Sequence, residues 1–197
     1  MSYQAPTSFT YDPTRRIAFG GASVTSRGMW PELVVNHFRD AEGLNTGVGG
    51  QSVDSVIANQ LPAIKAFNPH LAIFWFGMSA LKGDNRDETT AYTEMTALVE
   101  DLRTFNPLIK IAVLTQPPVT RNNAATAKPK ELQRWNHLLR RNDAQVNVVI
   151  DIATDSLIDQ VGPGRHGDGV HLDWLGVGAH RVAGHVVQSI RPLLEGF

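Results

Sequence analysis

The stretch that decides the fold is Arg16-Ile17-Ala18-Phe19-Gly20-Gly21-Ala22-Ser23-Val24-Thr25-Ser26. Its apolar run over residues 17–19 is typical of a short buried strand. The glycine pair that follows favours a sharp, crowded turn that residues with side chains resist. Ser23 then comes at the carboxyl end of the strand, where open parallel sheets place their ligands. A serine in such a turn is often only a structural residue, so its role depends on the rest of the chain.

The rest of the chain alternates between strand-length apolar runs and helix-length amphipathic segments. Further strands are predicted over residues 71–76, 109–114 and 146–150. Helices are predicted over residues 30–38, 53–67 with a break or kink at Pro62, 88–105 and 129–142. A last helix is expected to have Asp173 as its N-cap and Leu175 on its buried stripe. This alternation predicts a three-layer α/β/α sandwich with a mostly parallel sheet of about five strands.

Length and composition restrict the class of protein. The chain has 197 residues and a net charge of −1, so we expect one domain over residues 15–197, preceded by an arm over residues 1–14. This charge gives no reason to expect a nucleic-acid partner. The chain has no cysteine, which excludes disulfides and thiol catalysis. Residues 1–15 are too polar for a signal peptide and no run is long enough to span a membrane, so a cytoplasmic location is expected by default.

Four segments fall at the ends of predicted strands or in the last loop, and such positions share one edge of a parallel sheet. They are Gly21-Ala22-Ser23, Gly49-Gly50, Gly77-Met78-Ser79 and Asp168-Gly169-Val170-His171. A nucleophilic serine needs a base for its proton and a carboxylate that orients the base. The spacing of Asp168 and His171 lets their side chains meet around one turn. The backbone N–H groups of Ser23 and Gly50 are candidate donors to an oxyanion.

The four segments have the order and spacing of four sequence blocks of the SGNH hydrolases, which form part of the GDSL esterase/lipase group. Residues 16–194 therefore resemble this family. Ser23 stands at the family's nucleophile position, Gly50 at its oxyanion glycine, and Asp168 and His171 at its acid and base. The resemblance implies a flavodoxin-like α/β/α fold and hydrolysis of acyl or acetyl esters through an acyl-enzyme, without metal or cofactor. By the same analogy, the substrate is a small-molecule or glycan ester, with carbohydrate O-acetyl groups as one option.

The chain departs from the family pattern at two places. Where the family has Gly-Asp-Ser, this chain has Ala22 before the serine. Where the family has Gly-x-Asn-Asp, it has Ser79 and Ala80 in place of the last two residues. The family's asparagine is an oxyanion donor, and the loss of one such donor typically lowers kcat by about 10²–10³-fold. Ser79 is therefore a candidate replacement donor, and a slow or unusual hydrolase is expected.

Two alternatives remain open at this point. His166, Asp168 and His171 have a spacing that suits a metal site, although that interpretation leaves Ser23 unexplained. The departures at Ser79 and Ala80 also fit a non-catalytic binding or structural module built on the same fold. His180 and His185 lie off the apolar stripe of the last helix and are expected to be solvated.

Overall fold

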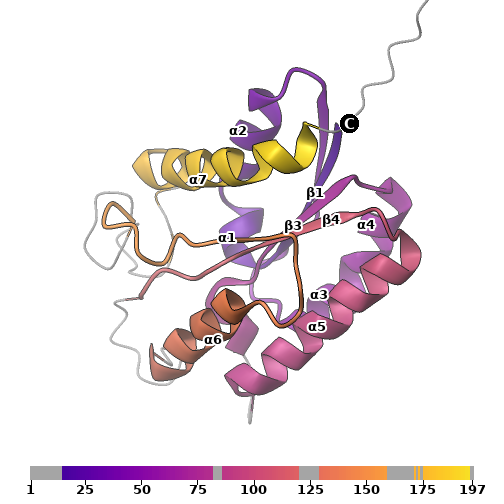
Figure 1. The fold of residues 1–197 in the computed structure, drawn as a ribbon. Helices are drawn as coiled ribbons and strands as arrows, with labels where there is room; N and C mark the ends of the chain where they lie inside the picture. The colour runs from indigo at the N-terminus through magenta and orange to yellow at the C-terminus, as the bar shows by residue number, and fades with distance from the viewer. Residues whose placement is uncertain are drawn as a thin grey trace, which may run out of the picture.

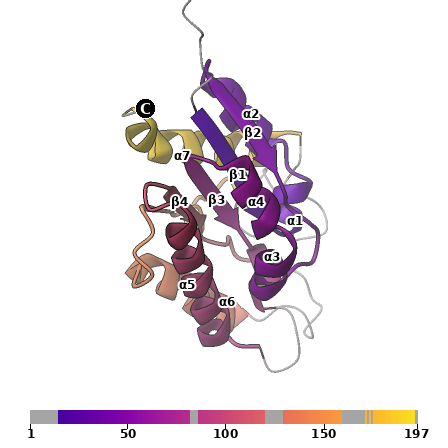
Figure 2. The same ribbon diagram turned by 90° about the vertical axis from the view of Figure 1, so that its right-hand side faces the viewer.

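The centre of the molecule is an all-parallel sheet. The computed structural model describes residues 15–81, 86–119, 129–158, 171, 173 and 175–195. Within these residues the strand order is β2-β1-β3-β4-β5, with every pair of neighbours parallel; β1, β3 and β4 are labelled in Figure 1, and β2, β1, β3 and β4 in Figure 2. The strands are β1 (Arg15–Gly21), β2 (Ala41–Asn45), β3 (Leu71–Trp75), β4 (Lys110–Leu114) and β5 (Val148–Ile150). This is the predicted fold class, with the strand order of flavodoxin-like proteins.

Helices cover both faces of the sheet, which gives three layers (Figures 1 and 2). One face is packed mainly by α2 (Trp30–His37) and α7 (Val177–Leu194), whose apolar residues join one core cluster with side chains of β1, β3 and β4. The second cluster, on the other face, is built by α3 (Val53–Asn59), α4 (Leu61–Phe67), α5 (Glu88–Phe105) and α6 (Pro129–Arg141). Two short helices follow strands, namely α1 (Ser23–Ser26) and the 3₁₀ helix η1 (Gly77–Leu81).

The central strands have the burial that their sequence predicts. All five residues of β3 are buried, and the five residues of β1 from Ile17 to Gly21 are buried as well. A strand covered on both faces needs such a continuous apolar run. The strand β2 was not identified from sequence, because it lies at the edge of the sheet and is polar and largely exposed.

Helix boundaries agree closely with prediction where the termination signals are local. The helix α5 begins after Asp87, whose carboxylate accepts a hydrogen bond from the Thr90 N–H at 2.7 Å, and it ends before Asn106. The predicted break at Pro62 is also present, since α3 ends at Asn59 and α4 begins at Leu61.

The start of α7 differs from the prediction. The N-cap is Gly176 rather than Asp173, because the Asp173 carboxylate accepts a hydrogen bond from the Leu175 N–H and the helix begins only at Val177. The side chain of Leu175 therefore precedes the helix and is 74% exposed instead of lying on the buried stripe. His185 lies off the apolar stripe as predicted and is partly exposed, and its Nε2 lies 2.7 Å from an Asp155 carboxylate oxygen.

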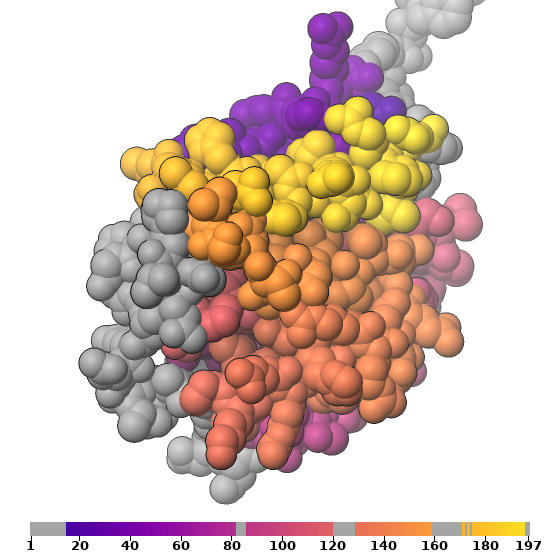
Figure 3. All heavy atoms as spheres, turned by 60° about the vertical axis from the view of Figure 1, so that its left-hand side comes forward, coloured from indigo at the N-terminus to yellow at the C-terminus, as the bar shows by residue number. Residues whose placement is uncertain are grey.

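The space-filling view shows how the carboxyl-terminal half covers one side of the molecule. Helix α7, in yellow, borders the segment that contains β5, and α6 lies beyond that segment (Figure 3). No helix of the described ranges is both long and apolar enough to cross a membrane. Residues 1–14, predicted as an arm, lie outside the described residues.

Candidate active site

Ser23 lies at the point where the strand order of the sheet reverses. It is the first residue of α1, directly after β1, and η1 follows the neighbouring strand β3. From β1 the chain proceeds outward to β2 on one side, and β3 lies on the other side. In open parallel sheets the crevice at the carboxyl ends of two such strands is where ligands bind. The sheet topology therefore places Ser23 in the position expected for a reactive group.

The turn before Ser23 is fixed against the end of β3. Gly21 has a φ of +137°, and a Cβ at this position would lie only 2.1 Å from the Trp75 carbonyl oxygen. The Ala22 N–H donates to the same carbonyl at 3.2 Å, and the Thr25 hydroxyl donates to it at 3.0 Å. Only glycine fits at position 21, because any side chain would collide with the backbone of β3.

The Ser23 hydroxyl is in contact with His171. The distance between Ser23 Oγ and His171 Nε2 is 2.9 Å, although the two residues are 148 positions apart in the chain. Both residues are partly buried. When the imidazole carries its proton on Nδ1, Nε2 accepts the hydrogen bond from the hydroxyl and can remove its proton. This arrangement is chemically capable of generating a serine nucleophile.

The acid predicted for this pair, Asp168, lies outside the described residues, as does the rest of segment 159–170. The two aspartates that follow β5 have other partners. Asp151 accepts two hydrogen bonds from Arg140, which hold the pKa of its carboxyl below the usual value despite partial burial. Burial raises the pKa of Asp155, but hydrogen bonds led by that from His185 outweigh it and keep the pKa low. Both carboxylates are thus engaged with basic side chains of α6 and α7.

The second glycine turn and η1 lie beside the α1 segment. A Cβ on Gly49 would lie 3.8 Å from the Ser23 Cβ, so this turn is adjacent to Ser23, and Gly50 has a φ of +78°. Gly77, the first residue of η1, has a φ of +60°, and a Cβ on it would lie 3.1 Å from a methyl group of Val24. Ser79 is partly buried within η1. Three of the four predicted segments thus pack around one short helix.

The departures from the family pattern have a structural explanation. Ala22 is 1% exposed and Ala80 is fully buried. A carboxylate at either position would be removed from water and would need hydrogen-bond partners. In this chain the Ala22 N–H and the Thr25 hydroxyl both attach the turn to the Trp75 carbonyl of β3.

Sequence reasoning missed several side chains that hold the nucleophile segment. The indole N–H of Trp30 donates to the Val24 carbonyl at 2.9 Å, and the Asn45 side chain donates to the Thr25 carbonyl at 3.0 Å. The buried Gln60 carboxamide bonds both backbone groups of Gly21. The contacts of Asn45 and Gln60 join residues 20 and 39 positions apart, which become neighbours only through the fold, so no local pattern indicates them.

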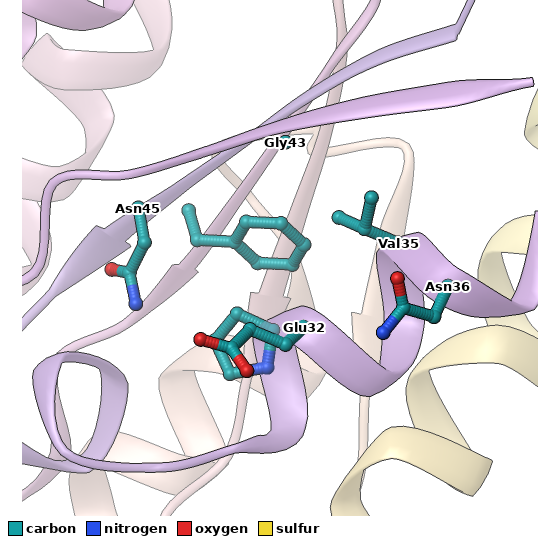
Figure 4. Close-up of a pocket in the computed structure, with 7 residues that line it drawn as sticks. Glu32, Val35, Asn36, Gly43 and Asn45 are labelled. Atoms are coloured by element: carbon teal, nitrogen blue, oxygen red, sulfur yellow. The ribbon is translucent and has the colours of Figure 1, made fainter.

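A hollow of about 300 Å³ lies between α2 and β2 (Figure 4). Glu32 and Asn36 line it from the helix, and Asn45 lines it from the strand. Neither Ser23 nor His171 contributes to its lining. The Asn45 side chain is already bonded to Thr25 and to the Gly47 N–H, so its role here is to hold the backbone.

The metal alternative gains no support from the described part of the chain. Those residues contain no cluster of three potential ligands from His, Cys, Asp or Glu. Two members of the predicted cluster, His166 and Asp168, lie outside the described residues, so this alternative stays untested.

Comparison with known proteins identifies the family. The model of the GDSL-like Lipase/Acylhydrolase family matches residues 8–178. The chain belongs to this family. A search of curated protein sequences gives no significant match. Family membership makes the protein a carboxylic ester hydrolase.

Solved structures share the fold at low sequence identity. A lipase/acylhydrolase from Enterococcus faecalis is 15% identical with a TM-score of 0.72, covering 91% of this chain and 96% of its own. An acetyl xylan esterase, AlAXEase, is 18% identical with a TM-score of 0.70, and the match covers 88% of this chain and 98% of the esterase. TesA is 14% identical with a TM-score of 0.70, and the match covers 91% of this chain and 100% of TesA. At these identities the structures establish a common fold and leave the substrate open.

Proposed function

We propose that the protein is a serine esterase that hydrolyses acyl or acetyl esters through an acyl-enzyme on Ser23. The observation that carries this proposal is the 2.9 Å contact between Ser23 Oγ and His171 Nε2 at the reversal point of the sheet. His171 acts as the general base, and Asp168 orients it and stabilises the imidazolium. No metal or cofactor takes part in this scheme.

The reaction follows from these roles. Ser23 Oγ attacks the ester carbonyl carbon while its proton passes to His171 Nε2. The tetrahedral intermediate collapses, the C–O bond to the alcohol breaks, and the alcohol leaves with the proton from His171. Water then attacks the acyl carbon while His171 takes one of its protons. The bond from this carbon to Ser23 Oγ breaks, His171 returns the proton to Oγ, and the carboxylic acid leaves.

The oxyanion of the intermediate needs donors at the same edge of the sheet. The Ser23 N–H is the first of α1 and therefore has no acceptor within its helix. Gly50 is the second proposed backbone donor, since its turn lies next to Ser23. Ser79 is the third, in place of the family's asparagine. Its hydroxyl is shorter than an amide side chain, so a weaker contact and a lower kcat are expected.

For the substrate we propose acetyl or short acyl esters, including O-acetyl groups of carbohydrates. One of the structures with the same fold is an acetyl xylan esterase, which makes acetylated glycans a reasonable first substrate class to test. A comparison of p-nitrophenyl acetate, longer p-nitrophenyl esters and acetylated xylan measures the preference directly. Higher kcat/KM on the longer acyl chains would contradict the acetyl assignment.

The role of Ser23 is tested by substitution. Ser23→Ala should lower p-nitrophenyl acetate hydrolysis by at least about 10³-fold, because the acyl-enzyme can no longer form. The matched control is Ser26→Ala, which removes an exposed hydroxyl from the same helix and should leave the rate unchanged. Equal rates for wild type and Ser23→Ala would exclude Ser23 from the mechanism.

The sequence also left open a non-catalytic binding module, because serine and alanine replace the family's asparagine and aspartate. A fluorophosphonate probe separates the two candidates, because it labels only activated serines. Stoichiometric labelling of the wild type, absent in Ser23→Ala, would exclude the binding module. An unlabelled wild type would support it.

A further inference from the structure

Gln60 lies between α3 and α4 and is 1% exposed, yet its side chain is polar. Its carboxamide forms a closed pair of hydrogen bonds with one backbone residue. The Gly21 N–H donates to Gln60 Oε1 at 2.9 Å, and Gln60 Nε2 donates to the Gly21 carbonyl at 2.8 Å. Pairing of β1 with β2 ends at Phe19 and Asn45. Beyond this point the Val48 N–H still donates to the Gly21 carbonyl at 3.0 Å, so the carboxamide is a second donor to that carbonyl and supplies the acceptor for the Gly21 N–H.

The remaining hydrogen-bonding capacity of the carboxamide goes to the second glycine turn. Gln60 Nε2 donates to Gln51 Oε1 at 2.6 Å, so both amide protons are used. The Thr46 hydroxyl lies 3.0 Å from the Phe19 carbonyl oxygen and 3.2 Å from Gln60 Oε1, so its one proton is shared between these two acceptors. Thr46 and Gln51 flank Gly49 and Gly50 in the chain, so one side chain joins both turns beside Ser23.

Only glutamine supplies this pattern at this reach. A carboxylate cannot donate to the Gly21 carbonyl, a guanidinium or ammonium group cannot accept from the Gly21 N–H, and asparagine is shorter by one methylene. A hydrophobic replacement would remove the acceptor of the buried Gly21 N–H. The chemistry of position 60 is thus set by the two turns that it connects.

We propose that Gln60 is a positioning residue for ester hydrolysis: it fixes the Ser23 turn and the Gly49–Gly50 turn relative to each other. This inference rests on the proposed function, because the relative position of the two turns matters only when Ser23 and Gly50 act on the same intermediate. It assigns Gln60 no contact with substrate. Misplacement of catalytic groups by about 1 Å can cost about 10²-fold in rate, so the effect should fall on kcat.

The test compares Gln60→Glu with wild type by p-nitrophenyl acetate kinetics, with active sites counted by fluorophosphonate titration. At pH 8 the ionised carboxylate loses both donors, and kcat per titrated site should fall by about 10–100-fold with KM within about threefold. On acidification the protonated carboxyl regains one donor and restores the closed pair with Gly21. The ratio of variant to wild-type kcat should therefore rise as the pH falls, which a purely structural role would not produce.

The matched control is Asn136→Asp. The Asn136 carboxamide is also buried and forms the same closed pair, here with the backbone of Gln116, at 2.8 Å for each bond. This variant loses the same kind of donor at the end of β4, so its kcat per titrated site should stay at the wild-type value. An equal fall in both variants would overturn the proposal, as would a Gln60→Glu enzyme with fewer titratable sites but unchanged kcat per site.

A milder pair of variants covers the case in which Gln60→Glu does not fold. Thr46→Val removes the hydroxyl that bonds both Gln60 Oε1 and the Phe19 carbonyl oxygen and should lower kcat per site by about 3–10-fold, whereas Thr46→Ser keeps the hydroxyl and the rate. Equal kcat in these two variants would contradict the inference. Failure of the proposed function is recognised separately, because the wild type would then neither react with the probe nor depend on Ser23.

Discussion

The steric demand at Gly21 leads to the sharpest prediction. In Gly21→Ala the new Cβ would lie 2.1 Å from the Trp75 carbonyl oxygen and 2.8 Å from the Thr25 hydroxyl oxygen. Relief of these contacts requires β1 and β3 to separate by about 1 Å, and overpacking of this kind costs about 1–3 kcal/mol. The φ of +137° adds backbone strain of about 1–3 kcal/mol for a residue with a side chain.

The two contributions together predict a loss of about 4 kcal/mol in the free energy of unfolding. For a domain of this size that corresponds to a fall in Tm of about 8–16 °C. Urea titration followed by circular dichroism measures the free energy, and calorimetry measures Tm. Residual folded enzyme should also hydrolyse p-nitrophenyl acetate more slowly, because Ser23 is only two residues away.

Gly184→Ala is the matched control for this substitution. Gly184 lies within α7 and has no atom within 4 Å of the position of a Cβ. Alanine there should raise stability by about 0.5–1 kcal/mol, because glycine is the weaker helix former. A Gly21→Ala protein with a Tm within about 2 °C of wild type would refute the steric reasoning.

Three further predictions concern the site, the acid stability and the core. Ser79→Asn should raise kcat more than it changes KM if position 79 faces the oxyanion, and a drop in kcat would show that the pocket is adapted to serine. The Asp155 carboxylate is 4% exposed and its pKa is lowered, because the hydrogen bonds led by that from His185 outweigh burial. The contribution of Asp155 to the free energy of unfolding is therefore present above its unfolded pKa of about 3.9 and is lost as the pH falls through the lower folded pKa. In urea titrations between pH 6 and pH 3, the free energy of unfolding should decline less steeply for Asp155→Asn than for wild type. Met95→Ala, at a side chain 1% exposed in the core beneath α5, should cost about 2–5 kcal/mol by urea titration, and a cost below about 1 kcal/mol would contradict its core position.

Local signals in the sequence were sufficient for most of the fold. The continuous apolar run of β3, the capping aspartate before α5 and the proline at position 62 each act through neighbouring residues, so their effect can be read without the fold. The prediction was wrong at Asp173, where the carboxylate binds the Leu175 N–H and delays the start of α7. The edge strand β2 escaped notice because its residues face water and lack an apolar pattern.

The sequence by itself determined the central strands, the longer helices, the resemblance to the family and the choice of Ser23 and His171 as candidates. Only the tertiary structure decided that these two side chains lie 2.9 Å apart, and that Gln60 joins the two glycine turns beside them. The physical reason is that periodicity and capping act over a few residues, whereas these contacts span 148 and 39 positions. Their partners are selected by the packing of the sheet, which no local pattern encodes.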